Sequence, residues 1–144
     1  MSVVREVTDR LLAALNSHDL DAVVRCFGPE AVYFNAAGMA EGHEQIRSYY
    51  DYLLTAYPDL CFTSLTKVTG DDLAMTEWRM TGTQRGMLLA PDGEPIEPTH
   101  RRVTLHGCSA SMVEDGLIVS YRVYFNELEH YAQLGLFLRS AQAS

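Results

Sequence analysis

The sequence has few cations, and this shortage excludes one broad class of function. Lysine and arginine together number 11 against 19 acidic residues, so the formal net charge is −8 and the pI is about 5.0. The cations are scattered, and only Arg101 and Arg102 are adjacent. Nucleic-acid-binding domains carry a basic stripe or patch. We therefore expect no nucleic-acid partner.

Cysteines are also few, and long apolar runs are missing. Cys26, Cys61 and Cys108 are an odd number without C-x-x-C spacing, which argues against a disulfide framework and against a zinc site. No two histidines have the spacing of metal ligands, so we expect no metal and no cofactor. No window reaches the roughly 18 apolar residues of a membrane span, and the opening "MSVVREVTDRLL" lacks the basic start of a signal peptide. The expected protein is cytoplasmic, with no membrane partner.

What the sequence does contain suits one domain spanning residues 1–144, because 47% of its residues are hydrophobic. Apolar residues at helical spacing predict a helix over residues 2–16, and Asp19 is a plausible N-cap for a second, short helix. A helix of about 15 residues is expected between the glycines near residue 40 and Pro58, and a final helix from about Glu127.

The strand pattern comes mostly after the long helix. A short strand is expected at residues 31–37, and four more follow at about 60–70, 73–84, 101–114 and 117–126. Asp115-Gly116 is a strong signal for a two-residue hairpin turn. Residues 90–100 hold three prolines and a glycine and are expected to form a loop. This order predicts an α+β fold, in which a curled, mostly antiparallel sheet packs on three to four helices and leaves a small-molecule pocket.

Four segments carry a resemblance to a known family. The stretches "EWRMTGTQRG", "PTHRRVTLHGCS", "EDGLIVSYRVYFN" and "YAQLGL" resemble the SnoaL-like polyketide cyclases of the NTF2-like (cystatin-like α+β cone) superfamily. The resemblance extends from Leu20 to Leu136 and implies the cone-shaped fold. The superfamily hosts cyclases, isomerases, dehydratases, epoxide hydrolases and binding proteins, so the fold alone does not define the reaction.

The resemblance also implies where catalytic groups would lie. The polyketide cyclases of the family perform an intramolecular aldol condensation with an aspartate at the end of the last strand, and the matching residue here is Asn126. A histidine of the preceding strand matches Ser109, and the histidine of a G-T-H-x-G motif matches Gln84. The sequence departs from the family at all three positions.

A second branch of the superfamily, the limonene-epoxide-hydrolase-like enzymes, holds a water molecule with a Tyr-x-Asn pair on the first strand. Tyr33 and Asn35 match this pair. The arginine and aspartate that the branch needs on its third strand match Trp78 and Met80, and its last-strand aspartate again matches Asn126.

The predicted hairpin also fixes which side chains share a face of the sheet. If Asp115-Gly116 is a two-residue loop and the strands pair without a bulge, Ser109 pairs with Arg122 and Leu105 with Asn126. Paired residues point to the same face. Arg122, Tyr124 and Asn126 would then line the cavity, whereas His106 would point outward and His130 would lie on the surface.

These considerations give a set of candidate site residues. The catalytic candidates are Asn126, Tyr33 and Asn35. The substrate-binding candidates are Trp78, Gln84, Ser109, Tyr124, Arg122 and Tyr50. For Asn126 a purely structural role is open as well, because Asn is a favoured helix N-cap and Glu129 follows at capping-box spacing.

The expected function is a tailoring enzyme of secondary metabolism, such as antibiotic biosynthesis. A cyclase or isomerase without an aspartate base would fold a hydrophobic substrate and stabilise developing charge with neutral hydrogen-bond donors. The alternatives are an epoxide-hydrolase-like enzyme that adds water and a binding or scaffold module without chemistry. A homodimer is expected through the outer sheet face, with Arg102, Thr104, His106 and Met112.

Overall fold

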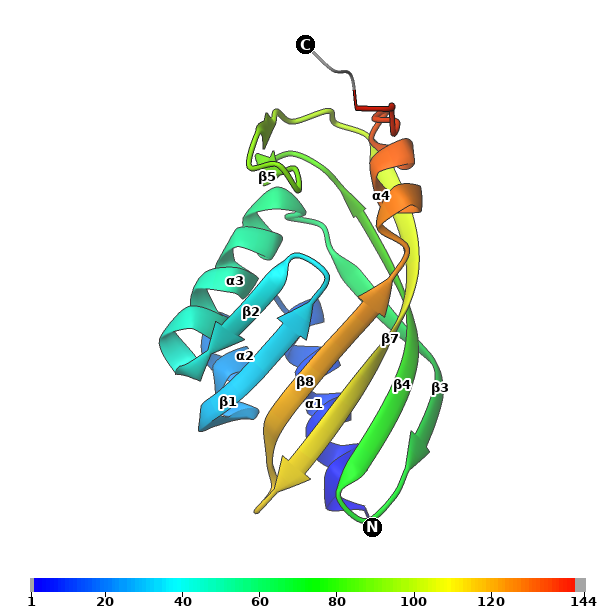
Figure 1. Cartoon of the computed structure of the whole chain (residues 1–144). Helices are drawn as coiled ribbons and strands as arrows, with labels where there is room; N and C mark the ends of the chain where they lie inside the picture. The colour runs from blue at the N-terminus through cyan, green and yellow to red at the C-terminus, as the bar shows by residue number, and fades with distance from the viewer. Residues whose placement is uncertain (1, 142–144) are drawn as a thin grey trace.

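The computed structural model describes residues 2–141 and shows a layer of helices against one face of a curled sheet (Figure 1). The helices are α1 (Val3–Asn16), α2 (Leu20–Arg25), α3 (Gly42–Ala56) and α4 (Glu127–Gln133). The main strands are β1 (Phe27–Asn35), β2 (Gly38–Glu41), β3 (Cys61–Thr69), β4 (Leu73–Thr83), β7 (Arg102–Glu114) and β8 (Leu117–Phe125). Two short strands, β5 (Leu88–Leu89) and β6 (Pro95–Ile96), pair in a small separate hairpin.

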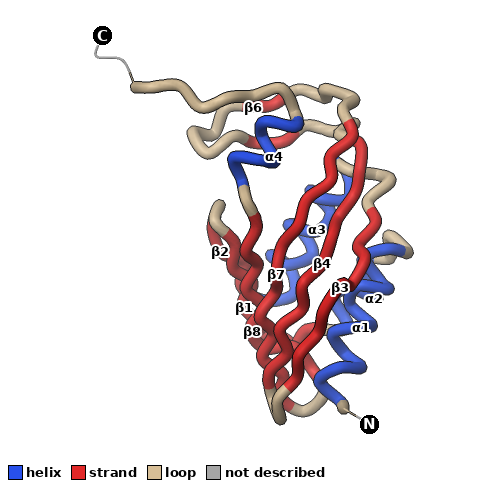
Figure 2. The backbone as a smooth tube through the Cα atoms, turned by 90° about the vertical axis from the view of Figure 1, so that its right-hand side faces the viewer, coloured by secondary structure: helices blue, strands red, loops and turns tan. Residues whose placement is uncertain are grey.

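The six main strands form one sheet in the order β2-β1-β8-β7-β4-β3. Neighbours are antiparallel except β1 and β8, which run parallel. Parallel neighbours need a long connection, and here almost the whole chain lies between the two strands. This pairing brings the first strand beside the last, and the sheet curls around the helices (Figures 1 and 2).

The first two helices begin where the sequence supplies caps, and each buries one apolar face. The Ser2 hydroxyl accepts from the backbone N–H of Arg5, and the Asp19 carboxylate accepts from that of Ala22. Helix α1 buries Val4, Val7, Leu11 and Leu15 against the sheet. The mostly antiparallel α+β fold, the hairpin at Asp115-Gly116 and the long third helix are therefore as predicted.

Three predictions about the elements were wrong. The first strand begins at Phe27 rather than near residue 31, so Gly28 and Pro29 lie within β1. Strand β2 was not expected, because its four residues were read as the approach to the long helix. The segment of residues 90–100 was expected to be only a loop, but Pro95–Ile96 pairs with Leu88–Leu89.

The predicted register of the last hairpin was also wrong. Glu114 pairs with Leu117 as expected, but a bulge follows, and Met112 pairs with Ser120 instead of Val119. An extra residue on one strand shifts every later pair by one. Ser109 therefore pairs with Val123, and the strand ends before Asn126.

The elements meet at one end of the curled sheet. There an opening is lined by the β1–β2 hairpin, by residues 44–52 of α3, by residues 89–93 and by α4. Figure 2 shows α4 and β6 at this end of the molecule. Helix α4 crosses this end directly after β8. Across residues 2–141, none of the helices combines the length and the apolar character needed to span a membrane.

Candidate functional site

The curled sheet and the helices enclose a cavity of about 130 Å³, which widens toward the opening into an outer cavity of about 780 Å³. The two cavities share lining residues from β1, α3 and α4, among them Asn35, Tyr52 and Glu127. A dry protein cavity of about 150 Å³ can hold one benzene ring. The inner cavity is close to this size, so it suits one six-membered ring at most, and the rest of a larger ligand would lie in the outer cavity.

Tyrosines dominate the wall of the inner cavity. The chain has eight tyrosines, and every one except Tyr124 lines it. They come from β1 (Tyr33), from α3 and its C-terminal end (Tyr49, Tyr50, Tyr52 and Tyr57), from β8 (Tyr121) and from α4 (Tyr131). A tyrosine offers an apolar ring face and a polar hydroxyl. The cavity can therefore bind flat apolar groups and also hydrogen-bond to their oxygens.

One polar group of the cavity is built around Tyr33. The Asn35 Nδ2 donates to the Tyr33 hydroxyl at 3.4 Å, while the Asn35 Oδ1 accepts from the backbone N–H groups of Ala37 and Gly38 in the turn to β2. The rings of Tyr33 and Tyr49 lie 4.6 Å apart. Burial raises the pKa of Tyr33 well above its usual value, and the neighbouring tyrosines raise it further. Tyr33 is thus held as a neutral phenol.

A second polar group joins β4, β7 and β8. The Trp78 indole N–H donates to the Ser109 hydroxyl at 2.8 Å, and both side chains are buried. Gly107 makes room for the indole, because a Cβ there would come within 2.4 Å of the Trp78 ring. Burial raises the pKa of Tyr121 to about 12, although the neighbouring Ser109 hydroxyl opposes the shift.

A third polar group lies where α3 ends and α4 begins. The Tyr57 hydroxyl lies 2.5 Å from the His130 Nε2, and both residues line the inner cavity. Burial lowers the pKa of His130 from 6.5 to about 4, so this imidazole is neutral at physiological pH. The expectation that His130 lies on the surface was wrong, because α4 turns its Glu127–His130 side inward.

Helix α4 is held at both ends. The Asn126 Oδ1 accepts from the Glu129 backbone N–H at 3.0 Å, which is an N-cap. The Gln133 side-chain amide accepts from the Thr104 backbone N–H and donates to the Thr104 carbonyl. It thus bonds to the β7 backbone as a neighbouring strand would. These contacts fix the rotation of the helix, and the rotation places His130 over the cavity.

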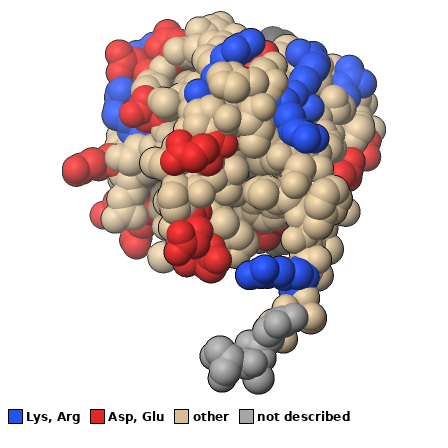
Figure 3. Space-filling view, turned by 90° about the horizontal axis from the view of Figure 1, so that it is seen from above, with Lys and Arg blue, Asp and Glu red and all other residues tan. Residues whose placement is uncertain are grey.

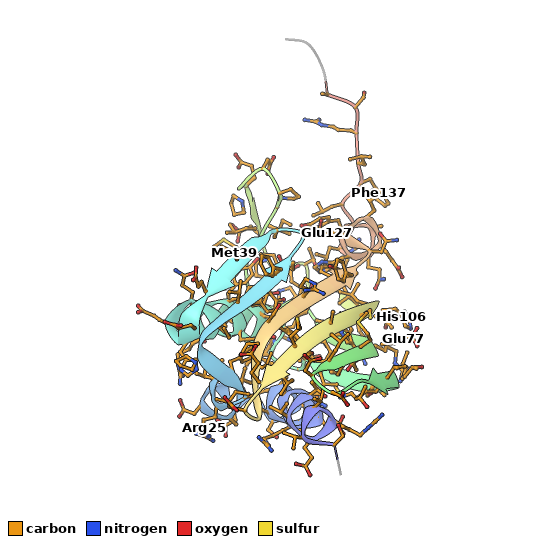
Figure 4. The ribbon with its side chains drawn as sticks, turned by 60° about the horizontal axis from the view of Figure 1, so that its bottom comes forward. Arg25, Met39, Glu77, His106, Glu127 and Phe137 are labelled. Atoms are coloured by element: carbon orange, nitrogen blue, oxygen red, sulfur yellow. The ribbon has the colours of Figure 1, made fainter. Side chains whose placement is uncertain are left out.

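Charge is scarce inside the site. Among the described residues, those lining the two cavities include no lysine or arginine, and their carboxylates are Glu44 and Glu127. Figure 4 shows Glu127 at the start of α4, near the end of the molecule that carries Met39. Lys and Arg are scattered among Asp and Glu on the surface at this end (Figure 3). Within residues 2–141 no cluster of three or more His, Cys, Asp or Glu side chains is suited to a metal ion.

The structure brings five of the nine candidate residues to the inner cavity. They are Tyr33, Asn35, Tyr50, Trp78 and Ser109. Asn126 is exposed and caps α4, so its observed contact is that of a helix N-cap. Whether any of the five is catalytic stays a prediction.

Gln84 is fully buried but does not line the cavity. Its Nε2 donates to the carbonyls of Gly86, Ile96 and Glu97, and its Oε1 accepts from the backbone and hydroxyl groups of Thr99. The amide therefore holds the segment of residues 85–100 in place. The expectation that Gln84 faces the cavity as a substrate-binding group was wrong, because these backbone and Thr99 contacts use both ends of the amide.

Arg122 and Tyr124 were expected in the cavity but lie on the opposite face of the sheet. The bulge in β8 is the cause, because it exchanges the two faces of the strand. Tyr121, Val123 and Phe125 line the cavity instead, while Tyr124 is 58% exposed and borders a shallow outer groove with Arg122.

The candidate set left out Tyr49, Tyr57, Tyr121 and His130, which all line the inner cavity. A signal was present in the segment "SYYDYLLTAY", where tyrosines recur along one helix. Tyr49, Tyr50 and Tyr57 lie close to one face at helical spacing, together with Leu53. All four side chains line the cavity. His130 carried no such signal, because the rotation of α4 depends on the Gln133 contact.

With the fold and the cavity described, the comparisons with known proteins identify the class. The model of the SnoaL-like domain matches residues 8–121, so the chain belongs to the SnoaL-like domain family. Among curated proteins, none matches the chain significantly.

Solved structures agree on the fold. TsrD from Streptomyces laurentii shares 26% identity at a TM-score of 0.80, with 92% of this chain and 95% of that chain covered. IdmH, a proposed polyketide cyclase from Streptomyces antibioticus, shares 25% identity at a TM-score of 0.75, covering 92% and 98%. A proposed SnoaL-like polyketide cyclase from Jannaschia sp. CCS1 reaches a TM-score of 0.82 at 19% identity, covering 92% and 91%. Ketosteroid-isomerase-like and NTF2-like proteins also match, and the fold is the NTF2-like cone.

Proposed function

We propose that the protein is a small-molecule tailoring enzyme of polyketide-type secondary metabolism, a cyclase or isomerase that works without an aspartate base. The observation that carries the proposal is the composition of the cavity, where aromatic walls are combined with neutral hydroxyl, amide and imidazole groups. Membership of the SnoaL-like family and the likeness to IdmH, a proposed polyketide cyclase, support it.

The substrate class follows from the same wall. Flat rings of tyrosine, phenylalanine and tryptophan favour a conjugated or cyclic apolar compound. The hydroxyls of Tyr33, Tyr57 and Tyr121 offer hydrogen bonds to carbonyl oxygens, and these bonds strengthen when an enolate develops. The substrate is therefore a hydrophobic compound with at least one ketone, and one ring of it fills the inner cavity.

A water-adding mechanism of the epoxide-hydrolase type has less support. Tyr33 and Asn35 are in contact, as that mechanism needs. Trp78 and Met80 occupy the positions matched to its arginine and aspartate, and neither side chain can activate an epoxide or a water molecule. The Asn35 Oδ1 is also used by the turn to β2.

A simple ketone tests the proposed function. We choose 1-tetralone, whose two fused rings suit the cavity and whose enolisation models the first step of a cyclase or an isomerase. Trp78 is the single tryptophan and lines the cavity, so quenching of its fluorescence reports binding. Mass spectrometry in D₂O then follows exchange of the α protons. We expect quenching and exchange above the buffer rate, whereas quenching without exchange would indicate a binding module and contradict an enzymatic role.

We also propose that the protein forms a homodimer through the outer face of the sheet and acts in the cytoplasm. The helices cover the other face of the sheet (Figure 1). The outer face exposes several large apolar side chains: Phe34, Met39, Met75, Met112 and Tyr124. No helix covers this face, and apolar side chains on an uncovered sheet face suit a contact with a second copy. The same face carries Arg102, Thr104 and His106, as expected from the alternation along β7.

A further inference from the structure

The proposed reaction needs proton transfer, and the structure offers one close contact for it inside the cavity. The Tyr57 hydroxyl and the His130 Nε2 lie 2.5 Å apart, and both residues line the inner cavity. We infer that Tyr57 and His130 form a neutral proton relay, which takes a proton from the α carbon of a ketone substrate and delivers another to its oxygen. This inference rests on the proposed function and adds the groups that perform its first step.

Burial explains why the relay has to stay neutral. The pKa of His130 is lowered to about 4 by burial, and the pKa of Tyr57 is raised above its usual value for the same reason. An imidazolium or a phenolate is therefore costly at this position. In a relay that passes one proton on as it receives another, neither residue becomes charged.

The step balances with two tautomers of the imidazole. Before the step, the His130 Nε2–H donates to the Tyr57 oxygen, and Nδ1 is a free acceptor. Nδ1 takes the proton from the α carbon, Nε2–H passes its proton to the Tyr57 oxygen, and the Tyr57 O–H passes its own to the carbonyl oxygen. The ketone becomes an enol, and the imidazole is left with Nδ1–H and an Nε2 acceptor. The reverse sequence, or exchange with water, restores the first tautomer.

The contacts of His130 leave Nδ1 available for this role. Among the described residues, Nε2 bonds to Tyr57, and no residue hydrogen-bonds to Nδ1. The ring is held between Tyr131, whose ring stacks at 5.4 Å, and Phe125, whose ring lies edge-on at 5.9 Å. The imidazole is thus fixed in orientation with one nitrogen unpaired.

Tyr57 is equally well positioned. Its ring lies against Gly82, where a Cβ would come within 3.1 Å. Its backbone N–H donates to the Leu53 carbonyl at the end of α3, and its carbonyl accepts from Leu60. The residue is fully buried. These contacts keep the hydroxyl at a fixed distance from α4.

A competing base has to be considered, because Glu127 lies one turn before His130 and also lines the cavity. The other titratable groups of the wall near this pair are the phenols of Tyr52 and Tyr131, and burial raises the pKa of Tyr131. Glu127 reaches both cavities and so lies toward the opening, whereas Tyr57 and His130 line only the inner one. The position of the pair favours it for a ring bound in the inner cavity.

The test measures exchange of the α protons of 1-tetralone in the wild type, Tyr57→Phe, His130→Gln and the double variant. Phenylalanine retains the packing on Gly82, and the glutamine amide N–H can still donate to the tyrosine oxygen but cannot change tautomer. We expect each single variant to lose about 10²-fold or more in rate, and the double variant to lose no more than either single one, because the two groups act as a unit. The Kd for 1-tetralone, measured by quenching of Trp78 fluorescence, should change by less than about threefold in each variant.

His100→Gln, an exposed residue that lines neither cavity, is the matched control and should retain the wild-type rate. Exchange at the wild-type rate in His130→Gln would overturn the relay and leave the proposed function standing. A loss in Glu127→Gln that exceeds those in Tyr57→Phe and His130→Gln would assign the base to Glu127 and also overturn it. If the wild type binds 1-tetralone without exchanging its protons, the proposed function fails and the relay fails with it.

Discussion

At the scale of single residues, the site depends on phenols that burial keeps neutral. The sequence allowed Tyr33 and Asn35 to be placed together, because residues two apart on a strand share a face. It did not allow His130 to be placed in the cavity, because the contact of Gln133 with Thr104 decides which side of α4 faces the cavity. Contacts between residues distant in the sequence leave no local pattern.

Stability should depend on pH through His130. The pKa of this histidine is about 4 in the folded protein and about 6.5 unfolded, so between these values the unfolded chain binds more protons and stability falls as the pH decreases. From pH 7.5 to 5.5 we expect this residue to reduce the free energy of unfolding by about 1 kcal/mol. Urea unfolding of the wild type and His130→Gln at both pH values measures this, and the same pH dependence in both proteins would contradict it.

At the scale of elements, the chain's local signals predicted most of the architecture. The Asp115-Gly116 turn and the long helix before Pro58 were placed correctly, because turn chemistry and helical periodicity are local properties. The bulge in β8 could not be predicted, since Val119 and Ser120 are ordinary strand residues. This single extra residue moved Arg122 and Tyr124 from the expected cavity to the outer face.

The capping of α4 should be measurable through Asn126. Asn126→Asp retains a capping oxygen and should leave stability and turnover nearly unchanged, whereas Asn126→Leu should cost about 1 kcal/mol. Turnover of the leucine variant should fall less than that of His130→Gln, because the helix remains attached through Gln133. Thermal melts and α-proton exchange measure the two effects. A loss of activity in Asn126→Leu as large as in His130→Gln, with unchanged stability, would return Asn126 to a direct chemical role.

At the scale of the whole molecule, the two faces of the sheet have different roles. One face is covered by helices and encloses the cavity, and the other exposes apolar side chains on β1, β2, β4, β7 and β8. The alternation along β7 allowed the inner position of Ser109 and the outer position of His106 to be predicted from the sequence, whereas the two faces of β8 were predicted the wrong way round. The proposed dimer follows from the outer face, and the proposed chemistry follows from the inner one.

The outer face gives a prediction about assembly. Each chain has a mass of 16.1 kDa, so light scattering after size exclusion should give twice that mass for the wild type. Tyr124→Glu and Met112→Glu should each shift the mass toward the monomer, because a charge would be buried in the contact. Met87→Glu, an exposed methionine outside the sheet, is the control. A wild type that is monomeric at high concentration would contradict the dimer.

The cavity as the site of chemistry is tested most directly by a crystal structure of the protein with 1-tetralone. The account predicts that the ketone lies in the tyrosine-lined cavity, with its oxygen within hydrogen-bond distance of the Tyr57 hydroxyl and an α carbon facing His130. A ketone bound in the outer groove beside Arg122 and Tyr124, with the inner cavity closed to it, would contradict the account.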